Sequence, residues 1–329
     1  MDDIRWFAVN RYGTLPVPAL EGAGLTIALG GEAPARLAVA VDSPRAVAAF
    51  EYAARHRVPL LFYLWDLPPW RLGTGRPDPT FLLGGRVRRI WRPWGGYRER
   101  AGYYSRIHFV ARRAAEVWCP SEATRGDIRA RFGIDAHRVP FCYDSHRFGP
   151  AGHREARSAE AISLLSISRL TPQKDHATLI RAAARLSPKP RVRIIGQGAE
   201  ADPLRRLAAD LDVPLDLPGA WAGDDEIVGA YREASVVVAP SRFEGFGLTP
   251  IEGVAMGVPV IASDIPPHRE FLGNRVRWFP PGDDEALAEQ IGDALLAPRP
   301  APEPLSDLTI EQCAARFLPG LERLLGGRR

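Results

Sequence analysis

Short apolar runs alternate with amphipathic stretches along the second half of the chain. The pattern predicts strands over 161–168, 191–195, 214–217, 235–239 and 258–262, and helices over 175–186, 202–211, 225–233, 250–256 and 284–296. Apolar runs of four to eight residues between helices are typical of parallel strands that are buried on both faces. The second half is therefore predicted to be a doubly wound α/β domain.

The first half repeats this pattern more loosely. It predicts strands over 37–41, 59–65, 116–119 and 138–142, and helices over 44–56, 98–115 and 122–132. A polar stretch without periodicity, 149–158, indicates the boundary between the two domains, 1–150 and 151–305. The proline-rich stretch 298–304 precedes an amphipathic helix over 308–325, so residues 306–329 are predicted to pack back toward the first domain. Two doubly wound domains leave a ligand-binding cleft between the carboxyl ends of their strands.

Composition narrows the class of protein. The chain has 329 residues, of which 46% are hydrophobic and 25% charged, as in ordinary globular proteins. It has no apolar run of about 18 residues, and its first residues lack the apolar core of a secretory signal. Cys119, Cys142 and Cys313 fit neither a disulfide framework nor metal-ligand spacing, which favours a reduced, cytoplasmic protein. The net charge of +4 gives no indication of nucleic-acid binding.

The segment 241–257 carries the first candidate site. It follows a predicted strand, and Gly247 lets the backbone approach a ligand closely. Thr249 and Pro250 are predicted to begin a helix, with Thr249 as its N-cap. A glycine loop that leads into a helix N-terminus suits an anion such as a diphosphate.

Two carboxylates lie in the same segment. Glu244 on the loop and Glu252 in the first helical turn suit the hydroxyl groups of a sugar and a ribose. Two structural alternatives stay open. Thr249 and Glu252 have the spacing of a capping box, and Glu244 fits a solvated loop residue equally well.

A second loop carries two cations. Arg169 and Lys174 follow the strand that ends at Ser168, and two cations on one such loop can converge on a pyrophosphate. The alternative is a pair of solvated surface charges. The basic residues of this chain are arginines apart from Lys174 and Lys189, so the lysine in this motif loop departs from the composition of the chain and favours a functional role.

Together these motifs resemble the retaining glycosyltransferases of family four. The resemblance rests on Ile-Ser-Arg-Leu-Thr-Pro-Gln-Lys at 167–174, Pro-Ser-Arg-Phe-Glu-Gly-Phe-Gly at 240–247, and the spaced pair Glu244 and Glu252. Further matches are Ile-Gly-Gln-Gly at 195–198, Pro-Gly at 218–219, and Gly-Val-Pro-Val-Ile-Ala at 257–262 followed by Glu270. The resemblance is strong over 163–296 and looser over 37–148.

The resemblance implies the GT-B fold, in which two Rossmann-like, doubly wound domains face each other across a cleft. The first would bind the acceptor and the second the nucleotide-sugar donor. By this resemblance, Arg169 and Lys174 would bind the diphosphate, Glu244 the donor sugar and Glu252 the ribose. The base would lie against Gly198 and the segment 217–220, which includes Gly219. Backbone groups would contact the sugar and phosphate at Phe246, Gly247, Leu248 and Thr249. No metal and no cofactor are expected.

The implied activity is retaining transfer of a hexosyl group from a UDP- or GDP-sugar to a hydroxyl of a glycan, lipid-linked or small-molecule acceptor. The first domain departs from the family pattern. Members often carry a histidine where Trp65 stands here, and Asp66 follows it. We hypothesise that Asp66 orients the donor sugar or the acceptor; a turn residue before Leu67 is an equal alternative. Gly30 and Gly31 are the candidates for the family's N-terminal glycine pair.

The stretch from Arg86 to Arg113 is basic, with tryptophans and tyrosines interleaved. It predicts either peripheral contact with the inner face of a membrane or a solvated helix face with aromatic residues in the core. Two further alternatives to the leading interpretation are a catalytically degenerate GT-B protein that binds without transfer, and a sugar-nucleotide epimerase. A dehydrogenase fits less well, because no G-x-G-x-x-G opens a helix after a first strand.

Overall fold

The computed structural model describes residues 2–7, 15–41, 45–68, 105–149 and 162–326. These residues form two compact units, Met1–Phe141 with Glu311–Arg329, and Cys142–Ile310. Each unit contains one six-stranded sheet whose paired strands run parallel. The predicted α/β class with two doubly wound domains is therefore confirmed.

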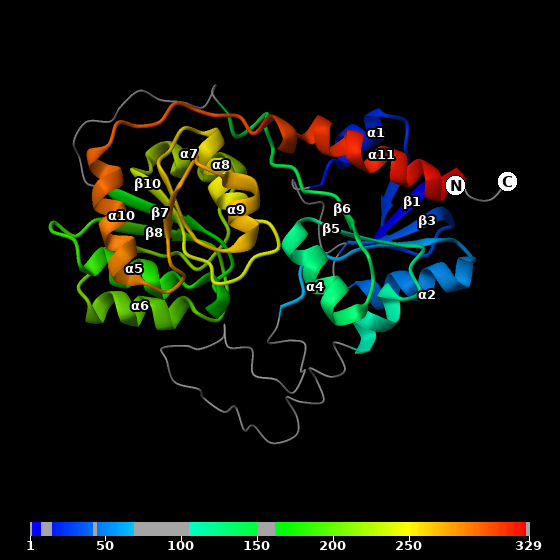
Figure 1. Ribbon diagram of the computed structural model, residues 1–329, viewed down its shortest axis with the longest axis horizontal. Coiled ribbons are helices and arrows are strands. Elements are labelled where there is room, and N and C mark those ends of the chain that lie inside the picture. Colours follow the sequence, from blue (N-terminus) through cyan, green and yellow to red (C-terminus); the bar gives the residue numbers. More distant parts are fainter. Residues whose placement is uncertain (1, 8–14, 42–44, 69–104, 150–161, 327–329) are drawn as a thin grey trace, which may run out of the picture. The chain divides into compact units, whose positions relative to one another are not determined.

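The first unit has the strand order β2-β1-β3-β4-β5-β6 (Figure 1). Its strands are β1 (Asp2–Phe7), β2 (Ile27–Leu29), β3 (Ala35–Ala40), β4 (Leu60–Tyr63), β5 (Glu116–Cys119) and β6 (His137–Arg138). Its helices are α1 (Val17–Gly22), α2 (Ala46–His56), a helical segment over 105–111, α4 (Glu122–Phe132) and α11 (Ile310–Gly326).

Helices cover both faces of this sheet. On one face, α2, the 105–111 segment and α4 bury a continuous apolar cluster against β3, β4 and β5. Local signals fix α4, because the Ser121 hydroxyl accepts a hydrogen bond from the Thr124 N–H at its start and Gly133 takes a left-handed conformation at its end. On the other face, Phe317 of α11 packs edge-on against Tyr63 and Trp118.

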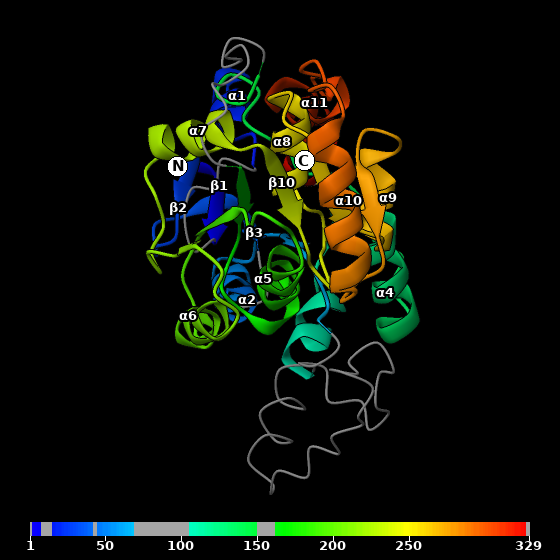
Figure 2. The same ribbon diagram turned by 90° about the vertical axis from the view of Figure 1, so that its left-hand side faces the viewer.

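The second unit has the strand order β12-β11-β10-β7-β8-β9. Its strands are β7 (Ser163–Ile167), β8 (Arg191–Ile195), β9 (Leu215–Asp216), β10 (Val236–Ala239), β11 (Val260–Ser263) and β12 (Arg277–Phe279). Its helices are α5 (His176–Ala184), α6 (Ala201–Asp210), α7 (Asp224–Glu233), α8 (Leu248–Ala255), α9 (Pro266–Leu272) and α10 (Asp284–Leu296), with short 3-10 turns η5 (Pro172–Lys174) and η6 (Ser306–Leu308). In both views α5 and α6 lie side by side (Figure 1 and Figure 2).

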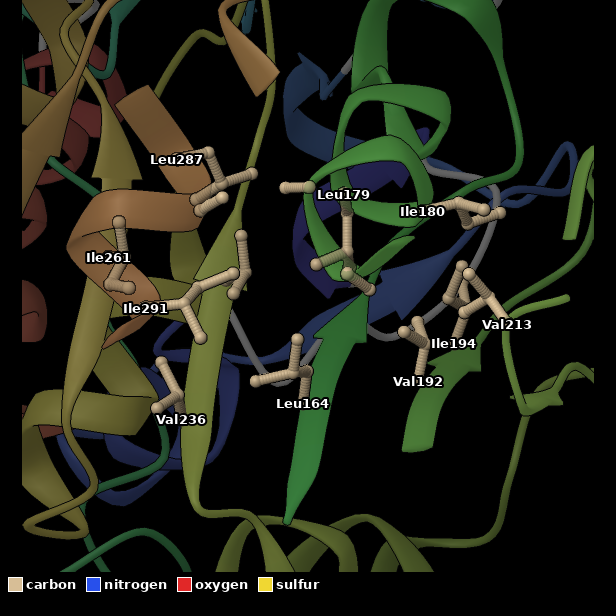
Figure 3. Close-up of a cluster of buried hydrophobic side chains, with 14 of the residues drawn as sticks. Leu164, Leu179, Ile180, Val192, Ile194, Val213, Val236, Ile261, Leu287 and Ile291 are labelled. Atoms are coloured by element: carbon tan, nitrogen blue, oxygen red, sulfur yellow. The ribbon is translucent and has the colours of Figure 1, made fainter. Parts of the chain in front are cut away.

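Apolar side chains from the strands and from α5, α6 and α10 form the core of this unit. Leu164 of β7, Val192 of β8, Leu179 of α5 and Ile291 of α10 belong to this one cluster (Figure 3). All four are fully buried. A rigid sheet holds the loops at its carboxyl edge in fixed positions, and the candidate site lies on those loops.

Several elements differ from the sequence-based predictions. The predicted strand over 138–142 is reduced to the two residues of β6, and β1, β2, α1, α9 and β12 were not predicted. The first strand escapes a hydropathy pattern because Arg5 lies in its middle. Arg5 is nevertheless buried, since its guanidinium donates to the carbonyl oxygens of Gly30 and Ala33 and pairs with Asp2.

None of the helices within the described ranges is both long and apolar enough to cross a bilayer. Most of the basic stretch from Arg86 to Arg113 lies outside the described residues, which include only 105–113 of it.

Candidate functional site

Two loops at the carboxyl edge of the second sheet are joined to each other. One follows β7 and the other follows β10, its neighbour in the sheet. The Thr249 hydroxyl donates to the carbonyl oxygen of Ile167 at 2.5 Å, and the Arg242 N–H donates to the carbonyl oxygen of Gln173 at 2.8 Å. Hydrogen bonds therefore connect the two predicted motif loops directly to each other.

A buried ion pair lies where these loops meet. The Lys174 ammonium lies 2.5 Å from Oε1 of Glu244, and the two side chains are only 13% and 15% exposed. The Ser241 hydroxyl donates to the same oxygen at 2.7 Å. Burial acts to raise the pKa of Glu244, but the charge of Lys174 and the hydrogen bonds outweigh it, so the pKa is lowered. The Glu244 carboxyl group is therefore ionised at neutral pH.

Arg169 is the second predicted cation on the β7 loop. It is exposed, and within the described part of the chain its side chain has no ion-pair or hydrogen-bond partner. An exposed guanidinium near a buried lysine suits an anionic ligand that brings two phosphate groups.

Two glycines after β8, Gly196 and Gly198, allow the backbone of the loop after β7 to lie directly against the backbone of the loop after β8. A Cβ on Gly196 would lie 1.9 Å from the carbonyl oxygen of Ser168, and a Cβ on Gly198 would lie 2.2 Å from that of Leu170. The Leu170 N–H also donates to the carbonyl oxygen of Gln197 at 2.9 Å. Gly198 thus has an observed role in holding the loop that carries Arg169, and its contact with a base stays a prediction.

Gly219 lies on the loop after β9, the edge strand beyond β8. It adopts a φ of +75°, which favours glycine. The Arg205 side chain donates to the carbonyl oxygens of Leu217 and Pro218 and fixes this turn. The loop connects to β8 through a hydrogen bond from the Gly196 N–H to the carbonyl oxygen of Ala220.

The start of α8 corrects the predicted cap. The helix begins at Leu248, its N-cap is Gly247 with a φ of +103°, and no side chain caps it. Thr249 is therefore not the N-cap, and it forms no capping box with Glu252. The reason is that both side chains are engaged elsewhere, Thr249 with the carbonyl oxygen of Ile167 and Glu252 with Tyr231.

Glu252 is held from α7. The Tyr231 hydroxyl, fully buried, donates to its Oε2 at 2.6 Å. Burial raises the pKa of Glu252 to about 7, although the hydrogen bond from Tyr231 and the charge of Arg147 act to lower it. This carboxyl group therefore changes its charge near neutral pH.

The comparisons identify the second half of the chain. Residues 153–307 match the family model described as "Glycosyl transferases group 1". This segment is a group 1 glycosyltransferase domain. The match covers the loops that carry Arg169, Lys174, Glu244 and Glu252, so the recognised motifs and the family model agree.

Curated relatives of this glycosyltransferase domain have named sugar-transfer activities. The chain is 30% identical over 200 residues to an MMP alpha-(1->4)-mannosyltransferase of Mycolicibacterium hassiacum, an alignment that covers 58% of the chain and 47% of the relative. It is 31% identical over 204 residues to a GDP-mannose-dependent alpha-(1-6)-phosphatidylinositol monomannoside mannosyltransferase of Mycolicibacterium smegmatis, covering 55% and 53%. The chain thus spans about half the length of these relatives.

Solved structures agree over nearly the whole chain. Anabaena HepE in complex with UDP-glucose superposes with a TM-score of 0.70 at 15% identity, covering 99% of both chains. The sucrose-phosphate synthase of Thermosynechococcus elongatus superposes with a TM-score of 0.64 at 19% identity, covering 99% and 98%. The fold is GT-B, as the sequence motifs predicted.

The structure brings most of the predicted site residues to one edge of the second sheet. Lys174 and Glu244 are in contact, and Phe246, Gly247, Leu248 and Thr249 lead from Glu244 into α8. Asp66 lies in the first unit, three residues after the end of β4, and is partly buried, so its role stays a prediction. No group of three or more potential metal ligands occurs among the described residues.

Sequence reasoning missed several residues that support the candidate site. Ser241 was inside a recognised motif but was assigned no role, although it bonds Glu244. Tyr231 and His268 lie on other helices, and a single tyrosine or histidine gives no signal in one sequence. Only the fold brings them to the site.

Proposed function

We propose that the chain is a retaining, metal-independent glycosyltransferase that moves a hexosyl group from a nucleoside-diphosphate sugar to a hydroxyl acceptor. The observation that carries this proposal is the buried pair of Lys174 and Glu244 at the junction of the two strand-end loops. In this pair, a cation that can bind a diphosphate, Lys174, lies beside a carboxylate that can bind sugar hydroxyls, Glu244.

The cations act on the leaving group. The Lys174 ammonium has three N–H donors, of which Glu244 takes one, so it can also donate to the diphosphate. The Arg169 guanidinium adds a second, exposed charge. As the bond between the anomeric carbon and the diphosphate oxygen breaks, negative charge grows on that oxygen, and these cations stabilise it.

The carboxylates act on the hydroxyl groups. Glu244 is ionised and accepts from hydroxyls of the transferred sugar, while Glu252 accepts from the ribose diol. The uncapped N-terminus of α8 adds backbone N–H groups for sugar and phosphate oxygens. The loops after β8 and β9, with Gly198 and Gly219, lie further along the same edge, where we place the base.

Retention follows when the acceptor attacks from the face that the diphosphate leaves. The acceptor oxygen forms a bond to the anomeric carbon, the bond to the diphosphate oxygen breaks, and the departing phosphate takes the acceptor proton. In this scheme the protein supplies charge and orientation, and no base of its own.

The named relatives guide the choice of substrates. One relative is GDP-mannose-dependent, and one structural neighbour holds UDP-glucose. We therefore propose a UDP- or GDP-hexose as donor and a glycan, lipid-linked or small-molecule hydroxyl as acceptor. The first unit would bind the acceptor, with Asp66 orienting acceptor or sugar.

A donor screen followed by a transfer assay tests the proposal. A UDP- or GDP-sugar is expected to raise the melting temperature, because a ligand that binds the folded state stabilises it. With the stabilising donor, Glu244→Ala is expected to abolish hydrolysis and transfer. Lys189→Met is the control and should retain both activities, because Lys189 lies outside the candidate site and pairs with Asp212 at the surface. Full turnover by Glu244→Ala contradicts the proposal.

A catalytically degenerate protein that only binds nucleotide is the second candidate. It is favoured by Trp65, which stands where family members often carry a histidine. Its ring packs edge-on against Phe141 at 5.1 Å and so belongs to the packing of the first unit. Donor binding without turnover on any acceptor would support this candidate. If the wild type is active, full activity of an Asp66→Ala variant would instead remove Asp66 from the mechanism.

For location, we propose the cytoplasm, with peripheral contact at the inner face of the membrane through Arg86 to Arg113. The basic and aromatic composition of this stretch supports the proposal. Cosedimentation with vesicles that contain anionic lipid tests it. Binding that does not change with the anionic lipid fraction would contradict it.

A further inference from the structure

His268 on α9 is buried next to the candidate donor site. Its side chain is 1% exposed, and its Nδ1 lies 2.9 Å from the carbonyl oxygen of Ser263. Because a carbonyl oxygen only accepts, Nδ1 carries the proton and donates. Burial lowers the pKa of His268 below its ordinary value, so the ring is neutral and Nε2 is unprotonated.

A chain of hydrogen bonds connects His268 with the ion pair. The Ser263 hydroxyl lies 3.3 Å from Nδ1 of His268 and donates to the carbonyl oxygen of Ser241 at 2.5 Å. The Ser241 hydroxyl then donates to Glu244, which receives Lys174 on the same oxygen. Each link is buried or largely buried, so a shift at α9 moves the loop that carries Glu244.

The same ring supports the turn before α8. A Cβ on Gly247 would lie 2.8 Å from Cδ2 and 3.0 Å from Nε2 of His268, so the glycine backbone rests on the ring. Beside it, Phe271 of α9 packs against Phe246 with ring centroids 4.3 Å apart. Nε2 is buried, and within the described residues it has no hydrogen-bond partner. Helix α9 thus holds the Phe246–Gly247 turn at two points.

We propose that His268 is a positioning residue for the transferred sugar, which it serves by holding the Ser241–Gly247 loop and the Glu244 carboxylate in their binding orientation. The inference rests on the proposed function. It separates two parts of the donor: Lys174 and Glu252 act on the nucleotide, whereas the Glu244 carboxylate, which His268 holds in place, acts on the sugar.

Affinity measurements with and without the sugar test this separation. Calorimetric titration uses the UDP- or GDP-sugar that stabilises the wild type, and the matching free diphosphate. For His268→Ala we expect tenfold or weaker binding of the nucleotide sugar and less than a twofold change for the free diphosphate. Lys174→Met is the matched contrast, because it should weaken both ligands.

Two conservative variants distinguish positioning from simple packing. His268→Asn loses the ring beside Gly247 but keeps a donor near Nδ1 for the Ser263 carbonyl. If this hydrogen bond positions the loop, the variant should recover most of the affinity for the nucleotide sugar. His268→Gln places its amide near Nε2 instead and should not. Recovery by Gln and not by Asn would contradict the assigned hydrogen bond.

The outcomes are separable. Wild-type affinity for the nucleotide sugar in His268→Ala, or equal losses for both ligands, overturns the positioning role alone. A wild type that binds no nucleotide sugar overturns the proposed function, and the role of His268 with it.

Discussion

At the scale of single residues, the ion pair of Lys174 and Glu244 stands out because the chain otherwise uses arginine almost throughout. An ammonium is a compact charge with rotatable donors, whereas a guanidinium is a planar fork. In the proposed function, a compact donor suits Lys174, which would serve Glu244 and a diphosphate at once. The planar guanidinium of Arg169 would suit its exposed position, where it would bind one phosphate group.

Replacing this lysine should reduce both stability and activity. Lys174→Met leaves the buried Glu244 carboxylate without its cation, which is expected to cost about 2–3 kcal/mol of unfolding free energy. Turnover should fall by roughly 100-fold or more, since the leaving-group charge loses its partner. Lys189→Met is the control, because Lys189 pairs at the surface with Asp212 and the carbonyl oxygen of Leu211. Denaturant unfolding and transfer rates provide the measurements, and equal effects of both variants would contradict this role.

Donor binding should depend on pH through Glu252. Its pKa is raised to about 7, and the ribose diol donates best to the ionised form. Affinity for a nucleotide sugar is therefore expected to rise roughly tenfold from pH 6 to pH 8 as the ionised fraction grows. A diphosphate diester does not titrate in this range, so calorimetry with the nucleotide sugar isolates the protein. Glu252→Gln should bind weakly and without this pH dependence.

The same carboxyl group makes an opposite contribution to stability. A raised pKa means that the folded chain holds a proton on Glu252 between its unfolded value near 4.5 and about 7. Stability from this site is therefore present at low pH and is lost as pH rises through 7. Glu252→Gln should melt at a higher temperature than the wild type at pH 8, and this gain should shrink toward pH 5. Melting curves across this range check the sign.

At the scale of elements, the loop after β7 and the loop after β8 are in close backbone contact, and this contact fixes the position of the loop that carries Arg169. Gly196→Ala would place a methyl group 1.9 Å from the carbonyl oxygen of Ser168, so the loops must separate. We expect a loss of about 2–4 kcal/mol and weaker binding of the diphosphate.

Gly229→Ala in α7 is the matched control for this variant. A Cβ there meets nothing within 4 Å, and alanine favours the helix, so stability should be unchanged or slightly higher. Thermal unfolding and titration with a nucleoside diphosphate compare the two. A Gly196→Ala protein as stable as the wild type would show that the loops adapt.

Elements were predictable from sequence where local patterns suffice. The bounds of α4, β5, β8 and α10 follow from caps and apolar runs, and they agree with the predicted ranges. The predicted cap at Thr249 was wrong because its hydroxyl is taken by Ile167, a partner 82 positions away. The strand β1 was not predicted because a charged residue, Arg5, lies in its middle. The Arg5 guanidinium can be buried there because it donates to carbonyl oxygens of a turn that is distant in the sequence. Long-range partners, which no local window contains, account for both errors.

The site shows the same division. The motif loops were recognisable because glycines and charges recur at fixed spacing, and their meeting followed from parallel strands that share an edge. The direct contact of Lys174 with Glu244, the support from Tyr231 and the support from His268 were not predictable. They depend on side-chain directions that the fold alone sets.

At the scale of the whole molecule, α11 comes from the end of the chain and completes the core of the first unit. Cys313, Phe317 and Leu321 are buried on it, and its Gly320 meets the Trp118 ring so closely that a Cβ would lie 2.3 Å away. Arg323 adds an ion pair with Glu116 of β5.

A side chain at position 320 should therefore destabilise the first unit selectively. Gly320→Val is expected to lower the unfolding free energy by about 2–3 kcal/mol, because Trp118 cannot move out of a packed core. Gly326→Ala, where a Cβ meets nothing within 4 Å, is the control at the end of the same helix. Limited proteolysis followed by mass spectrometry shows which unit opens. Cleavage that begins within 162–310 would contradict this expectation.

The position of α11 has a consequence for the order in which a newly made chain matures. During synthesis, residues 142–310 emerge complete and can close their own core, while the first 141 residues, already outside the ribosome, lack their last helix. Until that helix is made, the surface around Tyr63 and Trp118 that Phe317 covers stays open. The part of the protein that is translated first is thus finished last, and a ribosome that stalls before residues 311–326 are made leaves a complete second unit attached to an incomplete first unit.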